Sequence, residues 1–545
     1  MRATKMKKAI TKTQLLLALM MAIALFTTAA HAAAPGITGP TFHLTAQPAF
    51  LTQPDGAMVY SWGYGCASQP TSFVPAAVPR PTGGCPLMQV PGPTLVVTEG
   101  QTVVVTLVNN LPSAAGNTSL LFPGFQVTAT NGVQGLLTRE STPTTSTTCV
   151  VASCVTYTFT ASSPGTRAYY SGTQGDLQVE MGLYGAIIVL PNTSNNAFTC
   201  PLHNRNAGLN AAGTALVVNG EADYRLSTTG AAYHVAGSCY DREYMFQFSE
   251  IDPNIHTQAL AQVTAKAGCA LTDPSCHLEV PTEPYHPAYF MINGRSMPDD
   301  MDPNYAPEYP HQPYNGNPHM HPGELVLLRI LGTGRWQHPF HEHANHVRIL
   351  ARDGNLILSQ TSATQLAGPL LFTTTTTPGL AMDGIFYYTA KGLNWDMYGH
   401  NSSSGDALAK LACTPDANGY NTGTTTAVNY YEWCQDHDKP MQIAPFGDVA
   451  AGGPVTLPDA NLFTNGPWYG GSPYLGPDAT TRATGPTGTT PPSGTIANSP
   501  TGEAGFAFMW HSHNEREITT NNIFPGGMLM MMLVDSREFV INESN

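Results

Sequence analysis

Hydrophobic residues occur along this chain in short runs, and glycine, proline and asparagine separate one run from the next. β-branched residues dominate inside the runs, as in "TLVVTEGQTVVVTLVNNLP". The runs cover residues 94–112, 154–161, 184–191, 242–251, 323–332 and 528–534. Runs of this length between turn residues are typical of strands, and no long helical periodicity accompanies them. The pattern therefore predicts an all-β protein of the sandwich or barrel class.

Two segments depart from this pattern. Residues 1–32 combine a basic start, the apolar run "LLLALMMAIALF" and the sequence "AHA", which together indicate a secretory signal peptide. Residues 395–505 are rich in Gly, Thr, Pro, Asn and Asp, and we expect a long insertion with little regular structure there. The remaining chain predicts one β domain at 33–200 and a second built from 205–394 and 506–540. An alternative counts the insertion as part of a third, small domain.

The charge balance and the cysteines narrow the class of protein. With 23 Lys+Arg against 37 Asp+Glu the net charge is −14, and removal of the five basic residues of the leader would leave −19. This balance argues against nucleic acid as a partner, because nucleic acid requires a basic surface. The ten cysteines all follow the leader, and an even number in an exported chain favours disulfides. Pairing of close neighbours, Cys149 with Cys154 and Cys269 with Cys276, is the simplest expectation.

The location that follows from these features is outside the cytoplasm: periplasm, cell surface or extracellular medium. No segment after the leader is long and apolar enough to predict a membrane-spanning helix. The chain also lacks the glycine-rich phosphate loop, the dinucleotide fingerprint and the Gly-x-Ser-x-Gly element of common hydrolases. The remaining chemistry is carried by histidine.

Histidines are concentrated in "HPFHEH", residues 338–343, and in "WHSH", residues 510–513. Alternate side chains of a strand share a face, so His341 and His343 are expected to point one way and Glu342 the other. Two such strands side by side would bring four imidazoles together, and imidazole is a good ligand for copper, zinc, iron and nickel. The pattern predicts a metal site. The alternative interpretation is a set of surface or hydrogen-bonded core histidines.

Several pieces of the sequence resemble one family, the multicopper oxidases, which are built from cupredoxin domains. "PGPTLVVTEGQTVVVTLVNNLP" and "MGLYGAIIV" resemble the opening and the end of their first domain, and "DREYMFQFSEID" and "FMINGRSMPD" resemble the next domain. "HPFHEH" matches their His-Pro-x-His-x-His motif, and "WHSH" followed by "GGM" resembles their His-Cys-His motif. The order of the pieces is closest to the two-domain members. The resemblance implies two cupredoxin-like Greek-key β-sandwich domains.

The family also implies four His-x-His motifs around a three-copper cluster, and a separate blue copper held by a cysteine and histidines. Carried over by position, the cluster ligands of this chain would be His341, His343, His511 and His513. His338 would be a ligand of the blue copper.

The chain departs from the family pattern at six positions. Leu121, Pro123, Tyr170 and Gly172 stand where the resemblance places first-domain histidines. Ser512 replaces the cysteine, and Glu517 replaces the next expected histidine. Because a blue copper site depends on a soft thiolate, a serine cannot rebuild it. The ligands that remain suffice for one metal ion, which we expect to be copper, although iron, manganese and zinc also accept imidazole. Additional candidate ligands are His346, Glu517, His319 and His321.

These observations predict a copper-binding oxidoreductase that acts on a small molecule or a metal ion. Two alternatives remain open. One is a non-enzymatic protein for copper handling, and the other is a structural or surface-interaction protein on a degenerate cupredoxin scaffold. A homo-oligomer is compatible with each of them.

Overall fold

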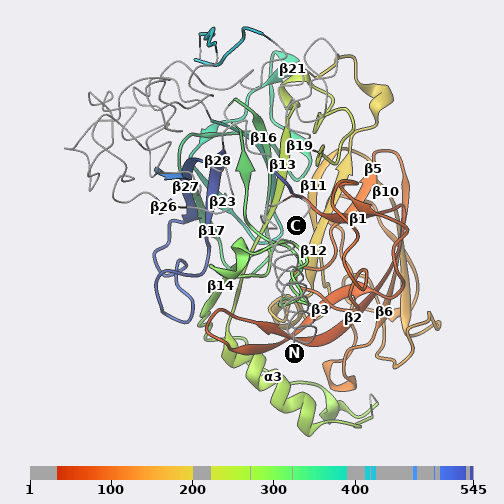
Figure 1. The fold of residues 1–545 in the computed structure, drawn as a ribbon. Coiled ribbons are helices and arrows are strands. Elements are labelled where there is room, and N and C mark those ends of the chain that lie inside the picture. The colour runs from red at the N-terminus through yellow and green to blue at the C-terminus, as the bar shows by residue number, and fades with distance from the viewer. Residues whose placement is uncertain are drawn as a thin grey trace, which may run out of the picture.

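The computed structural model describes residues 33–200, 222–270, 272–321, 323–388, 412–417, 419–424, 471–475, 496–497, 504–535 and 541–543. The predicted signal peptide and most of the predicted insertion lie outside these residues. The described chain forms two β-sandwiches side by side, one from its N-terminal part and one from its C-terminal part (Figure 1). The prediction of an all-β protein with two sandwich domains is confirmed.

The first sandwich has two five-stranded sheets. One runs in the order β11 (Gly165–Tyr170), β12 (Tyr184–Leu190), β5 (Leu95–Thr98), β1 (Gly36–Thr38) and β4 (Phe73–Val74). The other runs in the order β3 (Met58–Cys66), β2 (Thr41–Thr52), β6 (Thr102–Asn109), β10 (Cys154–Thr160) and β7 (Thr128–Asn131). A small hairpin pairs β8 (Val133–Gln134) with β9 (Arg139–Glu140).

The period-two pattern of the sequence explains how this core forms. On β6 the residues Val103, Val105 and Leu107 are fully buried. On β10 their direct partners across the antiparallel ladder, Phe159 and Tyr157 among them, are buried as well. Cross-strand pairs of aromatic and β-branched side chains stabilise a sheet most when both members face the core. Alternation along each strand thus fixes which face of the sheet packs inward.

The second sandwich has two seven-stranded sheets. The first contains β14 (Tyr289–Ile292), β13 (Arg242–Ile251), β16 (Leu325–Gly332), β24 (Ala381–Tyr387), β18 (Val347–Arg352) and β19 (Asn355–Leu356), with β22 (Leu370–Leu371) paired to β18. The second contains β15 (His319–Met320), β28 (Leu529–Asp535), β27 (Ala504–Ser512), β17 (His338–Glu342) and β23 (Thr373–Thr376). In the same sheet β25 (Gly471–Leu475) pairs with β27, and β26 (Ile496–Ala497) pairs with β25. A separate hairpin pairs β20 (Leu358–Ser359) with β21 (Ser362–Leu366).

Strands β25 and β26 are short strands within the predicted insertion. Both fall inside the segment 395–505, for which the composition predicted little regular structure, and β25 pairs antiparallel with β27. Backbone hydrogen bonding to the edge of an existing sheet does not require the alternating apolar pattern on which the prediction relied.

Helices are few among the described residues. The α-helices are α2 (Gly175–Gln178) and α3 (Pro253–Ala265), and the 3₁₀ turns are η1 (Ser113–Ala115), η2 (Thr193–Asn195), η3 (Ala236–Ser238), η4 (Pro274–Cys276) and η5 (Asp299–Met301). Helix α3 was not predicted from the sequence. Its N-terminal signal was present, because Asp252 caps the helix by accepting from the backbone N–H of Asn254, and Pro253 occupies the first turn. None of the described helices has the length and hydrophobicity that a membrane-spanning helix requires.

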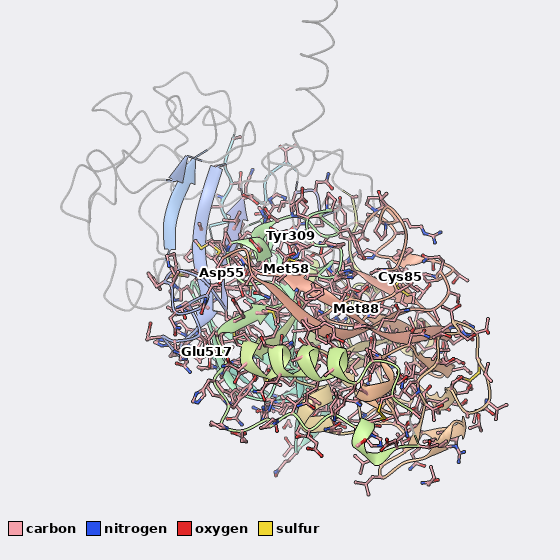
Figure 2. All side chains as sticks on the ribbon, turned by 90° about the horizontal axis from the view of Figure 1, so that it is seen from below. Asp55, Met58, Cys85, Met88, Tyr309 and Glu517 are labelled. Carbon is pink, nitrogen blue, oxygen red and sulfur yellow. A yellow bond between two sulfur atoms is a disulfide. The ribbon has the colours of Figure 1, made fainter. Side chains whose placement is uncertain are left out.

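The two sandwiches are joined by a mixed interface. Met88, labelled in Figure 2, packs in an apolar cluster that includes Ile251 and Met291 of the second sandwich. Asp55 accepts a hydrogen bond from the hydroxyl of Tyr289 at 3.0 Å. Deeper in the interface Asp383 of β24 accepts two hydrogen bonds from Thr166 of β11, one of them at 2.6 Å. The interface thus contains buried polar pairs that fix the relative position of the two domains.

Among the described residues, disulfides connect four cysteine pairs. Cys149–Cys154 and Cys269–Cys276 confirm the expected neighbour pairing. Cys66–Cys85 and Cys200–Cys239 also join cysteines that are consecutive in the sequence, as neighbour pairing predicts. Cys413 is also disulfide-bonded, and no cysteine is free within the part of the chain that the structure describes.

Candidate metal centre

Strands β17 and β27 bring the two histidine motifs together. The strands pair antiparallel, and His341 lies directly opposite His511. Their neighbours on the inner face, Phe340 of β17 and Trp510 of β27, pack against each other in the apolar core of the second sandwich. Because the inner face is anchored in this way, the register is fixed, and the alternate side chains are held on the opposite face.

Four imidazoles converge on that opposite face. The ring centre of His341 lies 4.9 Å from that of His343, 5.5 Å from that of His511 and 4.8 Å from that of His513. His343 and His511 are separated by 5.1 Å, and His511 and His513 by 5.6 Å. The sequence predicted this convergence from strand alternation alone. These distances show that the motifs are neighbours in space although about 170 residues separate them in sequence.

One pair of nitrogens has the spacing of two ligands on a single ion. The Nε2 atoms of His343 and His511 lie 3.2 Å apart. Two nitrogens bound at about 2.0–2.1 Å, with an angle between about 90° and 110° at the ion, would lie roughly 2.9–3.4 Å apart. The donor set also fits, because neutral imidazole suits copper, zinc, iron and nickel. The residues present therefore fit a transition-metal ion.

Hydrogen bonds orient two of the rings. The Nδ1 atom of His511 lies 2.7 Å from the carbonyl oxygen of Ser512, so Nδ1 carries the proton and Nε2 carries the lone pair. The Nδ1 atom of His341 lies 2.7 Å from the hydroxyl of Thr373 on β23. Such partners fix the direction in which a histidine presents its other nitrogen to a metal. Thr373 contacts the cluster, and no feature of the sequence indicated it.

The environment of the cluster keeps two of its imidazoles neutral. Burial, followed by the nearby charges of His343, His511 and His513, lowers the pKa of His341 to about 4. Burial also lowers the pKa of His511. Neutral imidazole is the form that binds a metal ion, so this environment favours ligation at neutral pH.

Exposure is uneven across the cluster. His341, His343 and His511 are buried, whereas the side chain of His513 is 51% exposed and its Nδ1 lies 3.9 Å from the carboxylate of Glu515. His513 therefore marks the side from which solvent reaches the cluster. His346 does not join the four rings. It packs at 5.0 Å against Phe372, which also contacts His341.

His338 occupies a different environment from the other histidines. Its Nδ1 lies 2.9 Å from Oε2 of Glu517 and its Nε2 lies 2.9 Å from Oε2 of Glu250, and all three side chains are buried. Burial alone would lower the pKa of His338, but the hydrogen bonds and charges of Glu250 and Glu517 outweigh it and raise the pKa to about 9. Both ring nitrogens are thus engaged by carboxylates. This geometry supports an imidazolium in an ion triad and disfavours the blue-copper role that the resemblance implied.

Ser512 and Asn514 extend this ion triad through Glu517. The hydroxyl of Ser512 donates to Oε2 of Glu517, and the side-chain amide of Asn514 donates to Oε1 at 2.8 Å. The two positions at which the sequence departs from the family motif therefore contact each other, in a buried network of oxygen and nitrogen atoms. Glu250 was missed as a member. The predicted strand 242–251 also contains Arg242 and Glu243, so no feature of the sequence distinguished Glu250.

Two further candidate ligands lie elsewhere in the second sandwich. The Nδ1 atom of His319 on β15 pairs with Asp535 at 2.6 Å, and Nδ1 of His321 lies 3.1 Å from the backbone oxygen of the same residue. Both histidines are buried. Their contacts with β28 give them a structural role in joining β15 to the sheet, apart from the four-histidine cluster.

In the first sandwich, the positions expected to hold histidines do come together. Leu121 and Tyr170 form an antiparallel bridge, with a backbone hydrogen bond of 2.8 Å. Leu121 also lies against Gly172, since a Cβ added to Gly172 would meet the Leu121 side chain at 2.8 Å. None of these residues offers a metal ligand of the kind that imidazole provides. The first sandwich thus retains the arrangement of the motif without its chemistry.

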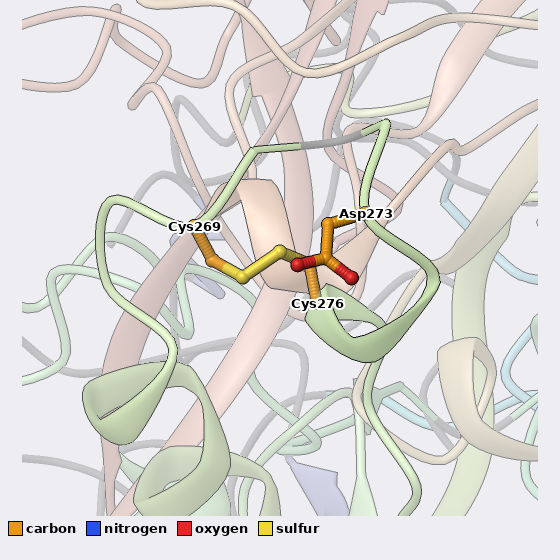
Figure 3. A group of neighbouring side chains, drawn as sticks. All are labelled: Cys269, Asp273 and Cys276. Carbon is orange, nitrogen blue, oxygen red and sulfur yellow. A yellow bond between two sulfur atoms is a disulfide. The ribbon is translucent and has the colours of Figure 1, made fainter.

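A third group of potential ligands is closed by a covalent bond. Cys269, Asp273 and Cys276 gather in the loop after α3 (Figure 3). The two sulfur atoms form a disulfide, so neither is a thiolate. The carboxylate of Asp273 accepts from the backbone and hydroxyl of Ser275, which lowers its pKa. This group is a turn closed by a disulfide bond.

Comparison with known proteins gives one family match and several structural resemblances. Residues 88–194 match the family model described as "Multicopper oxidase". No curated protein matches the chain. The solved structures that it resembles include the multicopper oxidase mgLAC, at 14% identity over 91% of this chain and 85% of that chain with a TM-score of 0.41. Another is the blue copper oxidase from Nitrosomonas europaea, at 13% identity over 90% of this chain and 85% of that chain with a TM-score of 0.42. The family match confirms, for the first sandwich, the resemblance inferred from the sequence.

Proposed function

We propose that this chain is an exported, multicopper-oxidase-like protein whose second domain binds one transition-metal ion, preferentially copper. The ligands are His341, His343, His511 and His513. The observation that carries the proposal is the convergence of four imidazoles from β17 and β27, with two Nε2 atoms 3.2 Å apart. The disulfides and the family match of the first sandwich support export and relationship to copper proteins.

The chemistry of the site follows from what surrounds it. A copper ion bound there would supply one-electron redox chemistry toward a small molecule or a second metal ion. The chain itself holds the neutral imidazoles, orients His511 through the carbonyl of Ser512, and leaves His513 accessible to solvent. It offers no thiolate beside the site, because Ser512 stands at that position. Four-copper reduction of dioxygen is therefore not the proposed reaction.

A second candidate function is copper handling without catalysis. The observation that favours it is the ion triad of His338, Glu250 and Glu517, which fills the place where the resemblance expects an electron-transfer copper. A protein without that centre can bind and deliver an ion by exchange at the accessible side of the cluster. Turnover assays with the loaded protein separate the two functions, since only the oxidoreductase consumes an electron donor.

The test is metal binding by purified protein that has first been stripped with a chelator. Titration with Cu²⁺ followed by calorimetry and spin resonance should give about one ion per chain, with nitrogen hyperfine structure from imidazoles. The double variant His343→Ala, His513→Ala should lose this site. The control is His43→Ala, His286→Ala, which removes two histidines at exposed positions outside the cluster.

The outcomes are distinct. Loss of binding in the first variant and retention in the control support the site. Undiminished binding in the first variant would place the metal elsewhere, and three or four ions per chain would contradict a single centre.

A further inference from the structure

A pocket of about 500 Å³ lies between the two sandwiches, apart from the four-histidine cluster. Its first-domain wall includes Leu121, Tyr170 and Gly172, and its second-domain wall includes the turn Gly332–Arg335. Strand β11, which ends at Tyr170, faces the second sandwich in Figure 1. The volume falls within the range of about 300–1,000 Å³ that is typical of small-molecule sites.

The pocket occupies the place from which copper ligands are missing. Leu121, Tyr170 and Gly172 are three of the four positions where the resemblance expected first-domain histidines, and all three line the cavity. They have no imidazole to offer, and Gly172 leaves no side chain in the wall. Because Leu121 lies against Gly172, a larger residue at 172 would displace it. Where the resemblance expects metal ligands at positions 121, 170 and 172, this chain therefore has a cavity with apolar walls.

The walls are mostly backbone and apolar side chains. Gly332 has no room for a side chain, since a Cβ there would meet the backbone oxygen of Thr377 at 2.4 Å. Gly175, by contrast, faces open space, with nothing within 4 Å of an added Cβ. Tyr170 and Tyr184 contribute aromatic rings. Rings and bare peptide planes favour contact with a flat molecule.

The polar groups of the lining are largely occupied within the protein. The hydroxyl of Thr333 donates to the carbonyl of Phe248 at 2.9 Å, and that of Ser171 donates to Gln178 at 2.6 Å. The hydroxyl of Tyr170 has no hydrogen-bond partner among the described residues, and burial raises its pKa so that it stays protonated. Tyr170 thus offers a hydrogen-bond donor in the lining to a ligand.

The charged side chains beside the pocket have partners within the protein. Arg335 lines one end, where its guanidinium stacks on Tyr285 at 4.1 Å and pairs with Glu283 at 2.9 Å. Asp176, which follows Gly175, accepts a hydrogen bond from Thr282 next to that pair. With Arg335 as the cation and Glu283 and Asp176 as carboxylates, the local charge does not attract an anionic ligand. The environment favours a neutral molecule.

The rim of the pocket exposes an apolar residue. The hairpin of β8 and β9 carries Leu136 and Leu137, whose exposed fractions are 91% and 65%. Leu137 belongs to the lining and Leu136 does not. Covering an exposed leucine is favourable by roughly 25 cal/mol per Å² of apolar surface removed from water, and a bound molecule would provide that cover.

We propose that this interdomain pocket binds a neutral, flat and mainly apolar molecule that carries one hydrogen-bond-accepting oxygen. The oxygen accepts from the hydroxyl of Tyr170. The aromatic or fused-ring body lies between Leu121 and the glycine-rich turn of the second sandwich, with Leu137 at its edge. The site is independent of the metal centre, because it shares no residue with it.

The experiment uses 6-propionyl-2-(dimethylamino)naphthalene, a neutral planar ketone whose fluorescence shifts to the blue in an apolar environment. Titration into the full chain should show a saturable blue shift with one site per chain. Gly175→Leu, which projects a side chain into the open space, should weaken binding at least tenfold, and Gly175→Ala should weaken it less. Tyr170→Phe should weaken binding about two- to tenfold, since it removes one hydrogen bond.

The matched controls separate the pocket from the rest of the surface. Leu137→Ser should weaken binding, whereas Leu136→Ser, at the more exposed neighbouring leucine outside the lining, should not. Metal content should be unchanged in every variant. Equal effects of the two leucine variants, or unchanged binding in Gly175→Leu and Tyr170→Phe, would overturn the proposal because the dye would then bind elsewhere. Tighter binding of the anionic dye 1-anilinonaphthalene-8-sulfonate at the same site would overturn its neutral character.

Discussion

The buried triad of His338, Glu250 and Glu517 should make the stability of this protein depend on pH in a specific direction. The pKa of His338 rises from 6.5 to about 9 in the folded protein. A raised pKa in the folded state means that the stabilisation is fully present below pH 6.5 and is lost as the pH rises through 9. At about 1.4 kcal/mol for each factor of ten in proton affinity, the triad contributes roughly 3 kcal/mol.

The perturbation is Glu517→Gln, which removes one of the two carboxylates and keeps an oxygen that the hydroxyl of Ser512 can reach. Glu250 and Glu517 both approach the ring of His338 at 2.9 Å, so we assign each about half of the stabilisation. The variant should therefore be less stable than the parent at pH 6 by on the order of 1–2 kcal/mol from this source. At pH 10, where the imidazole is neutral in both proteins, that difference should disappear.

The assay is urea-induced unfolding of chelator-treated protein with its disulfides intact, at pH 6, 8 and 10. The quantity to compare is the gap in unfolding free energy between the parent and the variant, because titrations common to both proteins cancel. Glu279→Gln, at an exposed carboxylate on the surface, is the control and should give curves parallel to the parent. A gap for Glu517→Gln that stays constant from pH 6 to pH 10 would refute the ion triad.

Three further outcomes are expected. Burial raises the pKa of Glu342 to about 8, so ionisation of its carboxyl destabilises the folded protein as the pH rises from about 4.5 to 8. Glu342→Gln should remove this pH dependence and stabilise the protein at pH 8 by ~2–5 kcal/mol, measured by thermal or urea unfolding. Copper-loaded protein should show no intense blue absorption near ~600 nm, because Ser512 provides no thiolate; an intense band in the intact protein would contradict this assignment. Reduction should lower the melting temperature, because each disulfide stabilises the folded state by roughly 2–4 kcal/mol through its constraint on the unfolded chain. Denatured, unreduced protein should contain almost no free thiols. Several free thiols would show that the cysteines are not paired in solution.

Local pattern correctly predicted which side chains of the histidine motif share a strand face. Strand alternation placed His341 and His343 on one face and Glu342 on the other, and the structure buries Glu342 in the core while the two histidines meet His511. The sequence could reach this result because the two-residue period of a strand is a property of the backbone alone. The same local reasoning found the Cys149–Cys154 disulfide, since few residues separate the two cysteines.

Tertiary structure decided what local pattern could not reach. The motif "HPFHEH" gives no sign that His338 would lie between Glu250 of β13 and Glu517, which come from distant parts of the chain. Burial and neighbouring charge set a pKa, and both depend on the complete packing of the sandwich. The interdomain pocket has the same origin, because Tyr170 and the turn at Gly332 meet only when the two sandwiches pack together. The sequence by itself determined which side chains share a strand face; the pairing and packing of those strands determined which imidazoles converge, which ring lies between two carboxylates and where a cavity remains.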